Sequence, residues 1–205
     1  MNYRDDPVGY EQRLRVKLKP ANLRATMTFA SLYQITSEMI THAVIEKVRD
    51  FYWIDAEGNS AFSDANQKRY QNEVLSLARK EFPASLKWLV QSKAITQAQA
   101  DRLSVIRAHR NDLTHELIRY MVDVDADPDI ELLGEAHAIL KDLHRFWIDI
   151  ELSTGGFFLA DGNIADQFDE IDPDEVMPAS LMLLRQCIEA YVDGLAATEP
   201  STESV

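Results

Sequence analysis

An all-α fold is predicted by three features of the sequence. Apolar residues recur every three or four positions through several long stretches, which is the period of an amphipathic helix. The 205 residues include only seven glycines and seven prolines, so few turns interrupt these stretches. β-branched runs are scarce, so strands are not expected. We therefore predict a bundle of about five helices, with an acidic irregular segment before the last one.

Residues 1–20 are predicted to form a basic N-terminal arm that precedes the bundle. Basic and apolar residues alternate over 13–19, which indicates a short strand or an extended segment on the surface. From about residue 21 to residue 53, apolar residues recur at helical spacing. This stretch predicts one long helix.

Two shorter helices are expected after a polar turn over 54–66. Ser63 or Asp64 is a suitable N-cap for a helix over 65–82, because each side chain can accept a hydrogen bond from the first turn. Pro83 interrupts this pattern. Since proline is well tolerated in a first helical turn, we expect it to open a new helix over 84–93.

The second half of the bundle is predicted from caps and spacing. Thr96-Gln97-Ala98-Gln99 fits a capping box and begins a helix over 97–122. Asp127-Pro128 is expected to begin the next helix. Its apolar residues form a packing seam: Leu133, Ala136, Leu140, Leu143, Trp147 and Ile150.

The predicted organisation is a single bundle over 20–152 with a C-terminal extension packed on the same domain. The extension, 153–198, comprises an irregular acidic segment up to about residue 177 and a helix over 178–195. Residues 199–205 form a polar tail that we expect to be disordered.

The charge of the chain is divided unevenly along its length. Residues 1–120 contain 18 Lys and Arg against 14 Asp and Glu, whereas residues 121–205 contain 3 against 20. The formal net charge of −13 therefore arises entirely in the last 85 residues. A negative net charge disfavours binding to nucleic acid when the acidic residues are spread over the whole chain. Here they are concentrated in the last part, so residues 1–120 remain a candidate for binding RNA.

Several classes of protein are excluded or disfavoured by composition. No stretch approaches 18 consecutive apolar residues, so no membrane span is expected. The N-terminus lacks the apolar region of a secretory signal, so we expect a cytoplasmic protein. Cys187 is the only cysteine and cannot form an internal disulfide or anchor a zinc cluster. No metal or other cofactor is expected.

The stretch RAHRNDLTHEL, residues 107–117, concentrates polar groups within a predicted helix. Residues four apart lie on one side of a helix, so one polar ridge is formed by Arg107, Asn111, His115 and Arg119. Arg110 and Thr114 form a second ridge beside the apolar residues of the helix. Arg110 and His115 are about 140° apart around the axis, so they converge on one ligand only across a groove or with a second copy of the helix.

This stretch resembles the motif of the HEPN superfamily, in which an Arg is followed after four to six residues by a His. Arg110-Asn111-Asp112-Leu113-Thr114-His115 has four intervening residues, with Asn in the favoured place after the Arg. The resemblance covers the motif and the helical plan of about residues 20–150. The resemblance implies an all-α homodimer in which two motifs meet in one cleft. It also implies a metal-independent ribonuclease of toxin–antitoxin or phage-defence systems, with a possible antitoxin partner.

The residue types suit RNA cleavage without a metal. His115 is predicted to act as general base and acid, because histidine exchanges protons near neutral pH. Arg110 is predicted to hold the phosphate, because its planar guanidinium stays protonated. Asn111 is the third predicted catalytic residue and orients the substrate or the histidine. Further substrate contacts are expected from Arg107, His109 and Thr114.

One position departs from the family pattern. Some family toxins have a Tyr two residues after the His, where nucleotide transfer inactivates them. This chain has Leu117 there, so that mode of control is not expected.

Other interpretations of these residues stay open. The same helix face can serve a non-catalytic module that dimerises or binds a partner or a nucleotide. For Arg119 a solvated, salt-bridged surface position is the better interpretation, and His137 and His144 are expected to be surface or packing histidines. The acidic residues of 161–175 can either cover a basic cleft as a phosphate mimic or form a solvated loop, the second being the more common case.

Overall fold

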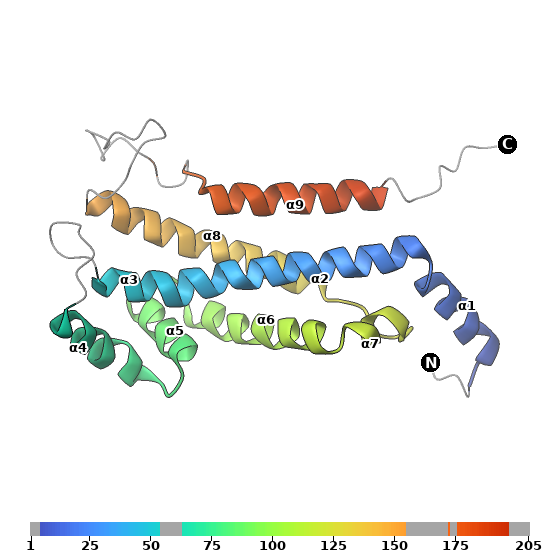
Figure 1. Ribbon diagram of the computed structural model, residues 1–205, viewed down its shortest axis with the longest axis horizontal. Coiled ribbons are helices and arrows are strands. Elements are labelled where there is room, and N and C mark those ends of the chain that lie inside the picture. Colours follow the sequence, from blue (N-terminus) through green and yellow to red (C-terminus); the bar gives the residue numbers. More distant parts are fainter. Residues whose placement is uncertain (1–4, 54–62, 155–171, 173–175, 197–205) are drawn as a thin grey trace.

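The computed structural model describes residues 5–53, 63–154, 172 and 176–196. All regular secondary structure within these residues is helical, which confirms the all-α prediction. Figure 1 shows an elongated bundle built around one long helical run. The expected acidic segment before the last helix, and the tail, lie almost wholly outside the described residues.

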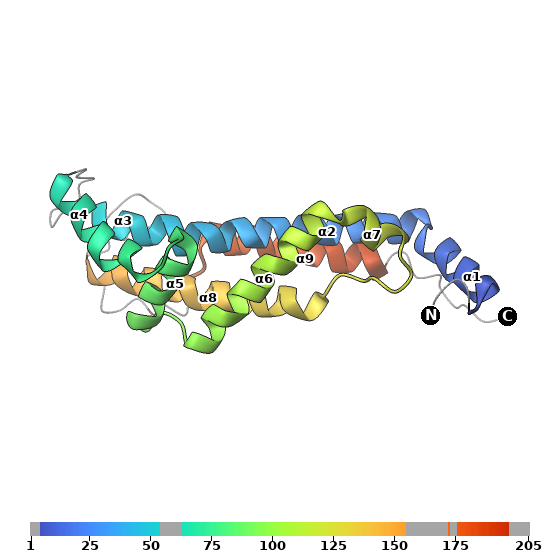
Figure 2. The ribbon, with the colours of Figure 1, turned by 90° about the horizontal axis from the view of Figure 1, so that it is seen from below.

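The long helical run consists of α2 (Pro20–Thr41), η1 (His42–Glu46) and α3 (Lys47–Trp53). It confirms the helix predicted over 21–53. It packs against α8 (Ile130–Ser153) and α9 (Ala179–Ala196) on one side, and against α6 (Gln97–His115) on the other. In Figure 2, α6 crosses the run obliquely. The run therefore lies at the centre of the bundle, and its buried residues recur every three or four positions: Phe29, Leu32, Tyr33, Thr36, Ile40, Ala43 and Val44.

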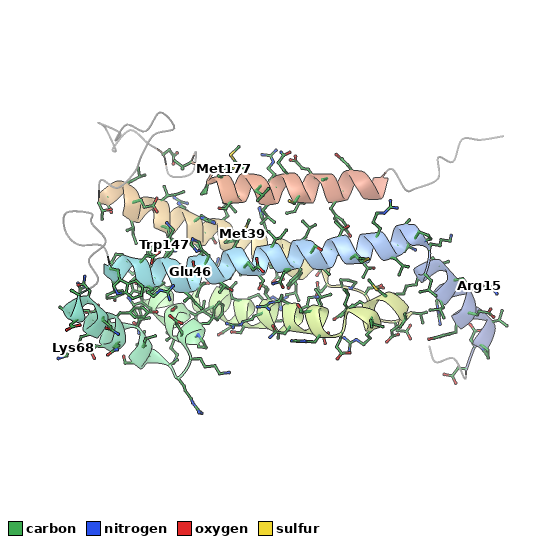
Figure 3. The ribbon with its side chains drawn as sticks, in the orientation of Figure 1. Arg15, Met39, Glu46, Lys68, Trp147 and Met177 are labelled. Atoms are coloured by element: carbon green, nitrogen blue, oxygen red, sulfur yellow. The ribbon has the colours of Figure 1, made fainter. Side chains whose placement is uncertain are left out.

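The segment η1 is a π-helix inside this run, a feature that the sequence did not predict. A π-helical turn shifts the backbone hydrogen bonds from four residues to five, and it can leave a carbonyl without a partner in the helix. The carbonyl of Ala43, which is 1% exposed, accepts a hydrogen bond of 2.9 Å from the indole Nε1–H of Trp147. Trp147 thus joins α8 to the π-segment, and it stacks on Trp88 of α5 (Glu81–Gln91) with ring centroids 6.2 Å apart. Figure 3 shows Trp147 beside the helical run.

The helix predicted over 65–82 is shorter than expected. Ser63 caps α4 (Asp64–Glu73) as predicted, by accepting the N–H of Asn66 at 3.1 Å. A 3-10 turn, η2 (Leu75–Leu77), then turns the chain into α5 (Glu81–Gln91), with Pro83 in its first turn as expected. The early end of α4 has a tertiary cause, because Val74 is fully buried and the hydroxyl of Tyr52 donates to Glu73 at 2.8 Å.

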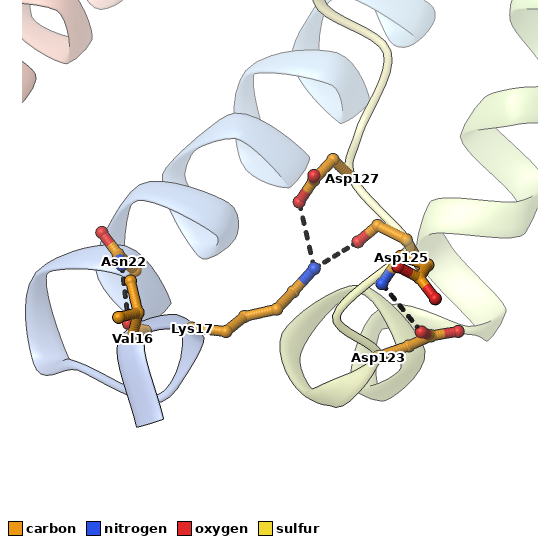
Figure 4. A network of polar contacts seen from close by, with 7 residues as sticks. Val16, Lys17, Asn22, Asp123, Asp125 and Asp127 are labelled. Carbon is orange, nitrogen blue, oxygen red and sulfur yellow. Dashed lines mark hydrogen bonds and ion pairs between the residues drawn. The ribbon is translucent and has the colours of Figure 1, made fainter. Parts of the chain in front are cut away.

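The prediction of a strand or extended arm over 13–19 was wrong, because α1 (Pro7–Lys17) is a helix. Asp6 caps it by accepting the N–H of Gly9 at 2.9 Å, and Pro7 occupies the first helical position. Lys17 fixes its end by donating to the carbonyl of Ala126 and to the carboxylate of Asp127 (Figure 4). Arg13, Arg15 and Lys17 therefore lie on a helix that is bonded to the loop before α8.

The last helices largely match the prediction. Asp129, two residues after the expected cap, begins α8 by accepting the N–H of Leu132 at 3.0 Å. The predicted seam of α8 is buried except at Ile150, which is partly exposed. The helix α9 matches the expected range and packs along α2, where its Leu184 is fully buried. No helix in the described ranges is long and apolar enough to cross a membrane.

The bond between Trp147 and Ala43 yields a stability prediction. Trp147→Phe should lower the free energy of unfolding by about 1–3 kcal/mol, because it leaves a buried backbone carbonyl without a donor. The matched variant is Trp88→Phe. The Trp88 indole donates to the hydroxyl of Tyr52, which keeps its own bond to Glu73, so this variant should cost less. Urea unfolding of both variants checks the order, and an equal or reversed cost would contradict the role given to the π-segment.

Candidate active site on helices α2, α6 and α7

The helix that carries the motif ends at His115, seven residues earlier than predicted. The capping box at its start is present, with Gln99 N–H donating to Thr96 Oγ1 at 3.2 Å and Thr96 N–H to Gln99 Oε1 at 2.8 Å. At Glu116 the backbone leaves the helical conformation, with φ −117° and ψ 26°. The chain resumes as α7 (Leu117–Val122). His115 is therefore the last residue of α6, directly before a break.

The break is held by side chains from both of the helices that it separates. Asp112 of α6 accepts hydrogen bonds from the guanidinium of Arg119, at 2.7 Å, and from the hydroxyl of Tyr120. Tyr120 is buried, whereas the side chains of Arg119 and Asp112 are 47% and 38% exposed. The surface salt bridge expected for Arg119 is thus confirmed. Neither glycine nor proline occurs near Glu116, so the break depends on these contacts.

Arg110 lies against α2 rather than in free solution. Its Nε–H donates to the hydroxyl of Ser37 at 3.2 Å, and Ser37 is itself only 6% exposed. The half-buried Arg110 lines an open groove of about 440 Å³ between α2 and the α6–α7 corner. The other residues of the groove are mostly apolar: Met27, Ala30, Ser31, Gln34, Ile35, Leu113, Thr114 and Leu117.

His115 and Asn111 are exposed on another side of α6. Within the described part of the chain, no hydrogen bond or ion pair engages either side chain. Five residues separate Arg110 from His115, which corresponds to about 140° of rotation and about 7.5 Å of rise. One copy of the chain therefore does not bring the predicted base and the predicted phosphate-binding group together on one face.

The three predicted substrate-contacting residues all contact other parts of the protein. The guanidinium of Arg107 lies 4.4 Å from the ring centroid of Phe82 on α5, a cation–π contact. The hydroxyl of Thr114 donates to the carbonyl of Arg110 at 2.8 Å, so only the rest of this side chain faces the groove. His109 accepts the N–H of Asp129 on Nε2 at 3.2 Å, and Tyr33 and Tyr120 contact its ring edge-on.

His109 consequently joins α6 to the start of α8. Burial lowers the pKa of its imidazole, and the nearby carboxylates of Asp129 and Asp112 only partly oppose this effect. The neutral ring is also the form that can accept the N–H of Asp129. Its position fits a packing role better than a direct phosphate contact.

Two residues at the site were missed in the sequence. Ser37 was overlooked because a lone serine inside an apolar helical pattern carries no signal of its contact partner. Asp112 was noticed only as part of the motif, yet it is bonded to Arg119 and Tyr120 of α7. Among the described residues, no three His, Cys, Asp or Glu side chains are grouped closely enough to hold a metal ion.

Comparisons with family models, with curated proteins and with solved structures found no match to this chain. The site is therefore interpreted from its own residues and geometry.

Tyr120→Phe tests how the break at Glu116 is held. It removes the hydroxyl that donates to the carboxylate of Asp112 and should lower the free energy of unfolding by about 1 kcal/mol. Tyr191→Phe on α9 is the matched control, because no hydrogen bond engages the Tyr191 hydroxyl within the described residues. Denaturant unfolding measures both variants. Equal losses of stability would show that the Tyr120 hydroxyl does not hold the break.

His109 also predicts how stability changes with pH. Because its pKa is lowered in the folded chain, the unfolded chain takes up a proton first as pH falls through about 6.5. Stability should therefore decrease from pH 8 to pH 5.5. His109→Gln keeps an acceptor for Asp129 N–H but does not titrate, so its decrease should be smaller.

Some decrease should remain in His109→Gln, because burial lowers the pKa of His144 as well. Urea unfolding at the two pH values provides the comparison. Identical pH dependence in the wild type and the variant would rule out a contribution from His109.

Proposed function

We propose that the chain is a metal-independent endoribonuclease of HEPN type that acts as a homodimer. The observation that carries the proposal is which side chains of the motif are accessible and which are engaged in contacts. His115 and Asn111 are exposed at the end of α6, whereas the half-buried Arg110 is bonded to Ser37 and lines an open groove on another side of the helix. The neighbouring polar residues Asp112 and His109 are engaged elsewhere. Within the described residues, His115 and Asn111 are thus free to meet a substrate, and Arg110 is held where it borders the groove.

The groove beside the motif supports a second copy of the chain as the missing part of the site. Met27 on its wall is 53% exposed, and Ile118, which follows the lining residue Leu117 on α7, is 75% exposed. Exposed apolar side chains at and near a mostly apolar groove are typical of a protein interface. A two-fold pairing through this face would place the same surface of each copy against the other. It would surround one cleft with both motifs.

In the proposed reaction, the 2′-hydroxyl of RNA attacks the adjacent phosphorus. His115 of one copy accepts the proton of that hydroxyl, and the P–O bond to the next nucleotide breaks. The departing 5′-oxygen takes a proton from the histidine of the second copy. Arg110 holds the non-bridging oxygens, where negative charge accumulates in the transition state. The products are a 2′,3′-cyclic phosphate and a 5′-hydroxyl end.

The direct test is RNA cleavage by the full chain in the presence of EDTA. Single-stranded RNA should be cut to 2′,3′-cyclic phosphate ends. His115→Ala and Arg110→Ala should each reduce the rate by about 100-fold or more, because each removes a group that acts in the transition state. His42→Ala, at an exposed histidine on the π-segment, and Arg15→Ala, on α1, are the matched controls and should cut normally.

Two further measurements separate the possible outcomes. Ile118→Glu should give a monomer by light scattering and should lose cleavage, because it places a charge in the proposed interface. Cleavage that requires a divalent metal, or that survives both motif substitutions, would contradict the proposal. A dimer that binds RNA or a protein partner but never cleaves would instead support the non-catalytic module. The biological setting in defence or toxin–antitoxin control, a cytoplasmic location and an antitoxin partner remain part of the proposal.

A further inference from the structure

The basic side chains of the acidic part of the chain gather in one place. Residues 121–205 contain 20 Asp and Glu but only three Lys and Arg and two His. All five of these side chains line a single cavity of about 270 Å³ between α8 and the first two turns of α9. They are His137, Lys141, His144, Arg145 and Arg185.

Two helices place these groups around the cavity. His137, Lys141 and Arg145 follow one another at intervals of four on α8, so they form one ridge of that helix. Arg185 faces them from α9. It also pairs with Glu189 one turn later at 2.8 Å, but both side chains are about half exposed or more, so the pair is weak and easily exchanged.

Among the described residues, the lining includes no acidic side chain, although acidic residues dominate this part of the sequence. Within the same residues, neither an ion pair nor a hydrogen bond engages the ammonium group of Lys141. The Nε2 atom of His144 is buried and has no hydrogen-bond partner in the described part of the chain. Several cations around one cavity repel one another at short range, so an anion bound among them would be stabilised.

The remaining wall of the cavity is apolar. Ile148 and Leu181 are buried, and Val176, Met177 and Pro178 border the opening at the start of α9. Figure 3 shows Met177 at this end of α9, and its side chain is 50% exposed. A ligand in the cavity would therefore meet cations on one side and apolar surface on the other.

We propose that this cavity binds a small organic phosphate ester, with the phosphate between Lys141, Arg145 and Arg185 and the organic group against Met177 and Leu181. A phosphate monoester carries nearly two charges and three acceptor oxygens, which suits three cations better than a carboxylate does. The cavity is slightly smaller than typical sites for drug-sized ligands, which favours a molecule of about mononucleotide size. This site is separate from the motif on α6 and does not depend on the proposed nuclease activity.

The test is calorimetric titration of the full chain with AMP and with inorganic phosphate at about 0.15 M salt. AMP should bind more tightly than phosphate, because only AMP has a group to cover the apolar wall. Lys141→Gln, Arg145→Gln and Arg185→Gln should each weaken AMP binding by about tenfold or more. Arg15→Gln on α1 changes the net charge equally and should alter it by less than about twofold.

Two variants locate the ligand within the molecule. Met177→Ser should weaken AMP binding and leave phosphate binding unchanged, because an exposed side chain is altered without removing a cation. Arg110→Gln should leave AMP binding intact if the ligand lies between α8 and α9. The proposal is overturned if neither compound binds, if AMP and phosphate bind equally, or if Arg15→Gln or Arg110→Gln weakens AMP binding as much as the cavity variants do.

Discussion

The rest of the structure depends on the continuous helical run from Pro20 to Trp53. It extends for about 50 Å and contacts α1, α6, α7, α8 and α9 along its length. Two buried polar residues on it have defined partners: Thr36 donates to the carbonyl of Leu32, and Ser37 accepts from Arg110. The π-segment adds a third polar contact, with Trp147. The contacts of Ser37 with Arg110 and of Ala43 with Trp147 reach other helices and have strict geometry, so they fix how α6 and α8 are rotated against the run.

The parts of the fold that follow from local rules could be predicted from the sequence. The period of apolar residues located the long run and α8, and cap residues located the starts of α4 and α6, because each depends on residues within one or two turns. The helix α1 was missed although Asp6 and Pro7 mark its start, because the basic and apolar alternation was interpreted as an extended segment. The end of α4 and the break at Glu116 could not be predicted from caps and period. Each is set by side-chain contacts with another element, such as Tyr52 with Glu73 and Asp112 with Tyr120 of α7.

The candidate site was predictable to a similar degree. The spacing of Arg110 and His115 was enough to show that one helix presents them on different faces. It did not reveal that Ser37 holds Arg110, or that His109 and Arg107 are committed to Asp129 and Phe82. The five basic groups between α8 and α9 were also hidden, since His137 and His144 alone read as ordinary packing residues. The cluster becomes visible only when Arg185 of α9, which lies 40 residues after Arg145, is placed beside them.

The chain before and after the break at Glu116 is held by different contacts. Arg110 is attached to α2 through Ser37, whereas the chain beyond His115 is attached to α6 through Asp112 and, after α7, to α1 through Lys17. Arg110 and His115 both belong to α6, so the helix sets their relative position, whereas the break at Glu116 sets where α7 lies beside His115. A different backbone angle at Glu116 would move α7 and its exposed Ile118 relative to His115. Geometry at the site can thus be tuned, in evolution or by engineering, through residues that never touch a substrate.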